Sequence, residues 1–262
     1  MRLFILGLSI AMALFLSRCG GAYPSDNADQ SPYEAVYNPA DDVVNASIKA
    51  HGFEDLGNAQ VEFSFRGTTY SMQRDHGAYR YAREFEKDGK RFLDEMTNDG
   101  FQRTIDGEAV QVPDSMANKY RNSINSVIYF AFLPYSLNDD AVVKELLGKS
   151  KIGDIEYWKI KVTFRQEGGG EDFQDEYVYW FHPEDLTLDY LGYSYEVNGG
   201  GIRFRAAINR RSVHTLLVQD YVNYKADPSQ VSVEELDEWF NSGKLEELSR
   251  IEIESVETLM PE

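Results

Sequence analysis

Alternating hydrophobic and polar residues mark the part of the chain between Asn58 and Val112. The alternation is seen in Val61, Phe63 and Phe65, and again over residues 79–85. A period of two predicts β-strands with one face buried. Three Asp-Gly pairs interrupt the pattern, and each suits a tight hairpin because glycine, and more weakly aspartate, tolerates positive φ. We therefore predict an antiparallel meander with turns at Asp88-Gly89, Asp99-Gly100 and Asp106-Gly107.

Helical periodicity occurs at three places. The first helix ends near Gly52, and its inward face carries Val43, Val44, Ser47, Ile48 and His51. The second is capped by Asp114 or Ser115, ends before Pro134 and carries Tyr120, Ile124, Val127, Ile128 and Ala131. The third starts at a capping box of Ser232 and Glu235, ends at Gly243 and turns Leu236, Trp239 and Phe240 inward.

The C-terminal half predicts a second group of strands. Their ranges are 158–164, 177–181, 188–196, 202–209 and 213–224, followed by a last edge strand over 251–256. Residues 141–147 form either a short helix or another strand. No solenoid-type repeat is present. The order of elements favours an α+β fold.

The hairpin from Leu188 to Asn209 provides the candidate site. If residues 198–201 form its loop, Val197 pairs with Ile202. One face then carries Leu191, Tyr193, Tyr195, Ile202, Phe204 and Ala206. The other face carries Tyr190, Gly192, Ser194, Glu196, Arg203, Arg205 and Asn209, with Glu196 opposite Arg203 and Ser194 opposite Arg205.

Two interpretations of these faces stay open: a core face against a solvent face, or a concave surface that orients the polar head of a ligand. In the second interpretation the hairpin contributes Tyr190, Arg203, Arg205 and Asn209. Tyr221 and Asn223 share a parity on a neighbouring strand and extend the set. The second helix adds Asn125 and Tyr129.

The N-terminus predicts export. Met1 and Arg2 precede an apolar run from Leu3 to Leu16, which is shorter than the ~20 residues that span a bilayer and is typical of a secretory signal peptide. The only cysteine, Cys19, follows this run in "LSRC", which resembles the lipobox of bacterial lipoproteins, although Arg18 stands where a small residue is usual. The alternative is ordinary cleavage after "GGA", with Tyr23 as the new N-terminus. We predict a signal peptide over 1–18 and lipidation at Cys19.

Composition limits the partners. The chain has 26 Lys and Arg against 44 Asp and Glu, and removal of the signal peptide would change its net charge from −18 to −20. This sign argues against nucleic acid and against unassisted docking on anionic lipid. Residues 19–40 are rich in Pro, Ser, Asp and Asn and predict a flexible tether. A single β-rich domain is expected over 41–262.

No catalytic signature is present, and we predict no cofactor, no metal and no catalytic residue. The four histidines lack metal-ligand spacing and are expected to be structural or exposed; they are His51, His76, His182 and His214. The acidic stretch Gly168–Glu176 lacks the spacing of an EF-hand and is interpreted as a hairpin loop. A pair of carboxylates for glycan hydrolysis stays open, because such a pair is set by the fold.

Several motifs in order resemble a family of uncharacterised bacterial secreted lipoproteins, classed as a domain of unknown function. They include "SINSVIYFAFLPYSLND" (123–139), "YWKIKVTF" (157–164), "YVYWF" (177–181), "DYLGYSY" (189–195), "GGGIRFRAAIN" (199–209) and "DYVNY" (220–224). The chain resembles more distantly the LolA-type lipoprotein-carrier fold. This resemblance implies a strongly curved antiparallel sheet, an unclosed barrel with covering helices, and a place in the cell envelope.

The leading functional hypothesis is a non-enzymatic lipoprotein, lipid-anchored to the outer membrane, that binds a lipid-like or other hydrophobic ligand in a concave cavity. Aromatic residues make up 13% of the chain, which favours an aromatic-lined cavity. Two alternatives from other classes are a carboxylate-dependent glycan hydrolase and an interaction or scaffold protein that uses its acidic surface.

Overall fold

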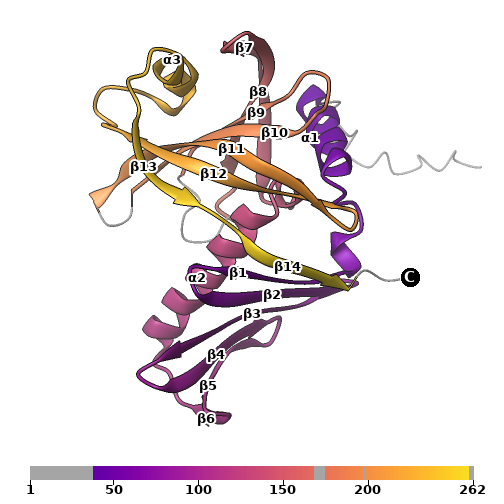
Figure 1. Ribbon diagram of the computed structural model, residues 1–262, viewed down its shortest axis with the longest axis vertical. Coiled ribbons are helices and arrows are strands. Elements are labelled where there is room, and N and C mark those ends of the chain that lie inside the picture. Colours follow the sequence, from indigo (N-terminus) through magenta and orange to yellow (C-terminus); the bar gives the residue numbers. More distant parts are fainter. Residues whose placement is uncertain (1–37, 168–174, 197–198, 260–262) are drawn as a thin grey trace, which may run out of the picture. The chain divides into compact units, whose positions relative to one another are not determined.

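Two seven-stranded antiparallel sheets and three α-helices make up the protein in the computed structural model, which describes residues 38–167, 175–196 and 199–259 (Figure 1). The predicted signal peptide, Cys19 and most of the tether lie outside the described residues, as does most of the Gly168–Glu176 stretch. The expected α+β class with an unclosed antiparallel sheet is confirmed. The single sheet of the prediction is divided in two.

The first sheet contains the predicted meander and one strand from the C-terminus. Its order is β14-β1-β2-β3-β4-β5-β6. The strands are β1 (Gln60–Phe65), β2 (Thr68–Asp75), β3 (Ala78–Lys87), β4 (Lys90–Thr97), β5 (Gly100–Ile105), β6 (Glu108–Val110) and β14 (Glu254–Leu259).

The second sheet runs in reverse chain order, β13-β12-β11-β10-β9-β8-β7. Its strands are β7 (Val142–Ile152), β8 (Ile155–Phe164), β9 (Tyr177–Phe181), β10 (Leu188–Tyr195), β11 (Gly201–Val213), β12 (Leu216–Ala226) and β13 (Glu246–Ile251). Residues 142–147 of the ambiguous segment 141–147 therefore belong to a strand, β7. The expected C-terminal edge strand is present as two edge strands, one in each sheet.

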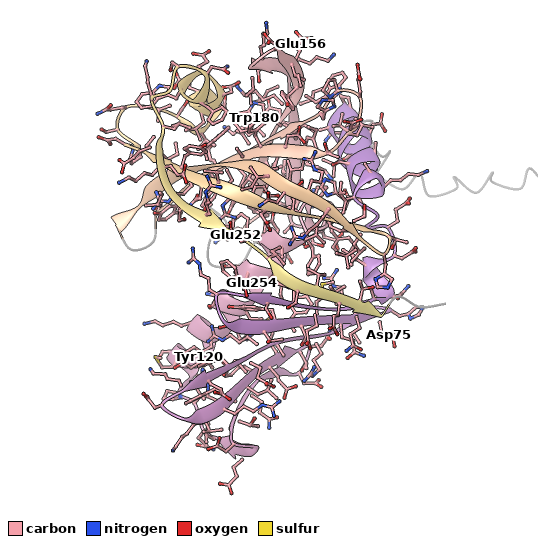
Figure 2. The ribbon with its side chains drawn as sticks, in the orientation of Figure 1. Asp75, Tyr120, Glu156, Trp180, Glu252 and Glu254 are labelled. Atoms are coloured by element: carbon pink, nitrogen blue, oxygen red, sulfur yellow. The ribbon has the colours of Figure 1, made fainter. Side chains whose placement is uncertain are left out.

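The C-terminal segment joins the two sheets, because β13 pairs with β12 and β14 pairs with β1. Figure 2 labels Glu252 and Glu254 at this crossing. Ile253 lies between the strands, and its backbone groups bond to side chains instead of a ladder. Its N–H donates to Asp220 Oδ1 at 2.9 Å, and its carbonyl accepts from Arg211. These two side chains satisfy the buried backbone where the segment changes sheet.

The helices agree with their sequence patterns. They are α1 (Pro39–Ala50), α2 (Asp114–Ala131) and α3 (Leu236–Asn241), with 3₁₀ turns at Leu56–Asn58, Tyr135–Asn138 and Val233–Glu235. The capping box of Ser232 and Glu235 is confirmed. Gly52 takes φ +68° just after α1, as a helix stop requires. The predicted cap of α2 is wrong, because Pro113 occupies that position and no side chain bonds to the first turn.

Two of the three predicted Asp-Gly turns are correct, and the third is displaced by one residue. Asp88-Gly89 and Asp106-Gly107 form two-residue turns as predicted, since Lys87 pairs with Lys90 and Ile105 with Glu108. The predicted turn at Asp99-Gly100 is wrong by one residue. Thr97 pairs with Gly100, so the turn is Asn98-Asp99 and Gly100 already belongs to β5.

The second sheet is covered on both faces (Figure 1). One face packs with α1, α2 and the first sheet in the main core, which includes Tyr179, Leu191 and Tyr221. The other face packs under α3 in a smaller core with Trp180, Tyr190, Phe204 and Leu236. Trp180, labelled in Figure 2, donates to Ser150 Oγ at 2.9 Å. Coverage of both faces explains why all five residues of β9 are buried.

The predicted register of the Leu188–Asn209 hairpin is wrong by three positions. Tyr195 pairs with Gly201 and Tyr193 with Arg203, whereas Glu196 was expected opposite Arg203. The predicted Ser194 pairing with Arg205 is wrong too, since Leu191 pairs with Arg205. When the register is shifted by an odd number of residues, the side chains of one strand share a face with the other set of side chains on its partner. Arg203 and Arg205 therefore share a face with Leu191, Tyr193 and Tyr195.

Candidate functional site

A largely apolar cavity of about 400 Å³ lies where α2 meets both sheets. Strand β1 contributes Phe63 and Phe65, and α2 contributes Val127 and Phe130. The C-terminal segment closes another side with residues of β13 and with Ile253. These walls come from segments almost 200 residues apart in sequence, so the cavity depends on the crossing of the C-terminal segment between the sheets.

Arg205 is the buried charge of this cavity. Its residue is only 8% exposed, and its guanidinium lies 4.0 Å from the centre of the Phe130 ring. One terminal nitrogen, Nη2, donates to the hydroxyl of Tyr193 at 2.9 Å. The Nε atom is buried, and no described residue accepts a hydrogen bond from it. None of the ion pairs among the described residues involves Arg205.

Asn223 lies beside Arg205, because the two residues are cross-strand partners in β12 and β11. Its amide nitrogen is 3.3 Å from Ser249 Oγ, and its buried Oδ1 has no partner among the described residues. The Ser249 hydroxyl can donate or accept, so one end of the amide stays unpaired whichever way the amide is turned. Arg205 and Asn223 thus place two unpaired polar atoms beside each other at the cavity.

Tyr221 is the third predicted site residue in the cavity. Its hydroxyl accepts from Gln219 Nε2 at 2.7 Å, and burial raises the pKa of this phenol. Tyr221 therefore contributes a neutral ring at neutral pH. The structure thus brings three of the predicted residues together, Arg205, Tyr221 and Asn223, although the register predicted for the Leu188–Asn209 hairpin is wrong.

Two other predicted residues, Asn125 and Tyr129, line a second cavity of about 330 Å³ on the other side of α2. The Tyr129 hydroxyl is 3.3 Å from that of Tyr179, and burial raises the pKa of Tyr129. Asp139 is also in this lining, and burial raises the pKa of its carboxyl while the charge of Arg74 lowers it. The second cavity is more polar than the first.

The remaining predicted residues lie elsewhere, and the structure corrects their placement. Tyr190 is on the opposite face of the second sheet, packed against Phe204 and Phe240 under α3. Arg203 shares the face of Arg205 but bonds to the Tyr195 hydroxyl and the Ile202 carbonyl. Asn209 is exposed at a bulge of β11 with φ +49° and donates to Asp220. The prediction placed Tyr190 on the wrong face because the register is shifted by an odd number of residues. It placed Asn209 wrongly because the bulge in β11 interrupts the alternation of faces.

The histidines have structural roles. His51 is fully buried, and its Nε2 accepts from the Leu188 N–H at 3.1 Å. His76 and His214 take positive φ in hairpin turns, and His182 Nδ1 accepts from backbone N–H groups of its own loop. Among the residues the structure describes, no three His, Cys, Asp or Glu side chains are grouped to hold a metal. Within the same residues, no helix is both long and apolar enough to span a bilayer.

Sequence reasoning missed most of the cavity wall. Phe63 and Phe65 alternate in β1 and were interpreted only as core, and Phe130 was not assigned to any site. Val61, at the other end of the same alternation, is core. The only signal in the sequence was the alternation that places these β1 residues on the buried face of the sheet. Alternation does not distinguish a residue in a packed core from one beside a cavity.

The fold and this cavity define the class: an open, antiparallel α+β protein with an apolar cleft between a helix and two sheets. The chain belongs to the family of unknown function DUF6503, whose model matches residues 35–253. This confirms the resemblance to a domain of unknown function. No curated protein matches the sequence.

Solved structures with similar folds are distant in sequence. A LolA superfamily protein, NE2245 from Nitrosomonas europaea, is 8% identical with a TM-score of 0.47, covering 83% of this chain and 92% of that one. A DUF1329 family protein from Desulfovibrio piger is 9% identical with a TM-score of 0.40, covering 85% and 92%. LppX, a lipoprotein of Mycobacterium tuberculosis, is 12% identical with a TM-score of 0.27, covering 61% and 88%.

Proposed function

We propose that this protein binds a hydrophobic ligand in the cavity between α2, β1, β12 and β13. The observation that carries the proposal is the cavity itself: about 400 Å³, walled largely by apolar side chains, with a few polar groups at one place. This volume lies within the ~300–1,000 Å³ typical of small-molecule sites, which combine apolar walls with few polar groups.

Burial of the ligand supplies the affinity. Each methylene removed from water contributes ~0.8 kcal/mol, so a chain of ten methylenes contributes about 8 kcal/mol before the cost of association. That cost leaves only a part of this gain as measured affinity. An apolar chain without a head group should therefore bind detectably.

A tryptophan in the cavity wall tests the proposal. Ser126 is exposed on α2 and lines the cavity, so Ser126→Trp should place an indole in the ligand's space without disturbing a buried residue. We expect dodecanol to bind the delipidated wild type and to bind Ser126→Trp at least tenfold more weakly, by isothermal titration calorimetry. Ser115→Trp is the matched control, since Ser115 is exposed in the first turn of the same helix and lines none of the cavities described. Equal binding by all three proteins would contradict the proposal.

We also propose that the protein is held in the cell envelope, at the outer membrane, by a lipid on Cys19. The support is the sequence: a short apolar run after Arg2, then the only cysteine, then a polar tether. The several acyl chains of a bacterial lipoprotein anchor hold stably, whereas a single chain binds only marginally. Cys19→Ser should therefore move the protein from the detergent phase to the aqueous phase on phase separation. A mature N-terminus at Tyr23 in the wild-type protein would show ordinary cleavage and contradict the anchor.

The two alternatives gain no specific support. A glycosidase needs two carboxylates across its substrate. Among the described residues, the cavity of about 400 Å³ has no carboxylate in its lining and the cavity of about 330 Å³ has Asp139 alone. A third pocket, of about 700 Å³ between β5 and the start of α2, has Asp114 alone. For the scaffold alternative, the acidic surface does not indicate which partner it would bind.

A further inference from the structure

The charge at the cavity has the opposite sign to the charge of the protein. The chain carries a net charge of −18, yet the described residues that line this cavity include two arginines, Arg66 and Arg205, and no aspartate or glutamate. Arg66 is exposed, with its guanidinium 4.9 Å from the ring centre of Phe65, whereas Arg205 is buried. Clefts that carry one sign of charge between apolar walls concentrate ligands of the other sign.

Arg205 also differs from Arg83 and Arg103, two other largely buried arginines. Arg83 and Arg103 have side chains 13% and 11% exposed, and both bind the carboxylate of Asp94. Arg205 is buried to a similar degree, but its described contacts are the Tyr193 hydroxyl and aromatic rings. A buried charge is costly unless an opposite charge or several hydrogen bonds compensate it. The protein provides that compensation for Arg83 and Arg103 and leaves it open for Arg205.

The free N–H of Arg205 suits an anionic group. Phe130 covers the face of the guanidinium and Tyr193 occupies one N–H, which leaves Nε–H as a buried donor without an acceptor. Carboxylate and phosphate oxygens are the acceptors that a guanidinium binds best. Asn223 lies on the adjacent strand. With its amide turned so that Oδ1 accepts from the Ser249 hydroxyl, Nδ2 is free to donate to a second oxygen of the same group.

The volume limits the apolar part. At about 30 Å³ for each water-sized group, the cavity holds roughly a dozen such groups. This volume matches one alkyl chain of medium length.

We infer that the cavity selects a single-chain amphiphile with an anionic head, whose carboxylate or phosphate binds Arg205 with help from Asn223. This inference rests on the proposed function. It adds the class of ligand: a free fatty acid or a single-chain lipid phosphate. The two sources share the same chemistry at Arg205 and differ in the head group.

Ligands of one chain length and different heads test the inference. Dodecanoate, dodecyl phosphate, dodecanol and dodecylammonium are titrated below their micellar concentrations into the delipidated full-length protein at pH 7.5. We expect at least one anion to bind 10- to 100-fold more tightly than dodecanol, because a charge-assisted hydrogen bond in a buried site has about this effect. The tighter of the two anions identifies the source. Dodecylammonium should bind more weakly than dodecanol.

Two arginine variants locate the selectivity. Arg205→Met keeps the length and apolar character of the side chain and should remove the preference for the anion while binding of dodecanol persists. Arg203→Met is the control, since Arg203 lies two residues away on the same strand face, outside the cavity lining, and should keep the full preference. Circular dichroism verifies that each variant is folded.

The outcomes separate the two proposals. Equal binding of dodecanol, the anions and dodecylammonium overturns the anionic class and leaves the hydrophobic cavity intact. Failure of all four ligands to bind overturns the proposed function, and the inference falls with it. A preference that survives in folded Arg205→Met overturns the role of Arg205. If that variant does not fold, the ligand series on the wild-type protein still decides whether the cavity selects anions.

Discussion

Asp94→Asn should lower the free energy of unfolding by about 3–5 kcal/mol, because it leaves two buried arginines without their counter-charge. Asp94 is fully buried in the first sheet, and its carboxylate accepts from Arg83 Nε at 2.8 Å and from Arg103 Nη2 at 2.7 Å. The three residues are cross-strand partners on β3, β4 and β5. Tyr120 of α2, labelled in Figure 2, covers this cluster with its ring centre 3.9 Å from the Arg103 guanidinium.

Glu95→Gln is the matched control. Glu95 is the next residue of β4, faces the other side of the sheet and pairs with Arg80; the side chains of Glu95 and Arg80 are 23% and 42% exposed. Exposed ion pairs contribute at most ~1 kcal/mol, so this variant should change the free energy of unfolding by less than that. Urea denaturation of both variants gives the comparison. Similar losses for the two would show that the Asp94 cluster is no more than a surface pair.

Acid should destabilise the protein through His51. The ring is fully buried, accepts from the Leu188 N–H through Nε2 and places Nδ1 3.4 Å from the Leu217 carbonyl oxygen, an arrangement that fits the neutral ring. Loss of solvation on burial lowers the pKa of His51 from 6.5 to about 4. Between these values the unfolded chain binds a proton that the folded protein does not, so stability is complete above pH 6.5 and falls toward pH 4. The loss amounts to about 3 kcal/mol.

His51→Gln separates this effect from the titration of carboxylates. Glutamine can accept from Leu188 and donate toward Leu217, but it does not titrate. We expect its free energy of unfolding at pH 7 to be lower than that of the wild type and nearly constant between pH 6.5 and pH 5. Parallel pH profiles for the two proteins, measured by urea denaturation, would show that His51 does not cause the dependence.

Local patterns predicted the elements well because their causes are local. The alternation of Val61, Phe63 and Phe65 gave β1, and the capping box of Ser232 and Glu235 gave the start of the last helical segment. Two of the three Asp-Gly turns also held. These features depend on side-chain direction, on capping and on positive φ, which a few neighbouring residues decide.

Those local patterns did not predict the register of the strands or the pairing of distant strands. The loop after Tyr195 is one residue longer than assumed and starts two residues earlier, and the resulting shift of three placed Tyr190 on the wrong face. The contacts of β14 with β1 join residues about 190 positions apart, and no local signal specifies them. Since this pairing brings the C-terminal segment to Phe63 and Phe65, the cavity could not be predicted from sequence. Asn223 was named only because it shares the parity of Tyr221 on its own strand, and the pairing that places it beside Arg205 was not available from the sequence.

Native mass spectrometry of the protein purified from its own membrane shows whether a ligand occupies the cavity. We expect a species with one additional noncovalent mass, which is released on denaturation, whereas acyl chains on Cys19 stay attached. The same measurement on Ser126→Trp should show that mass much reduced, and on Ser115→Trp unchanged. Reproducible detection of the polypeptide with its anchor alone, in gentle detergent and with the Ser115→Trp and wild-type proteins folded, would contradict the claim that this cavity binds a hydrophobic ligand.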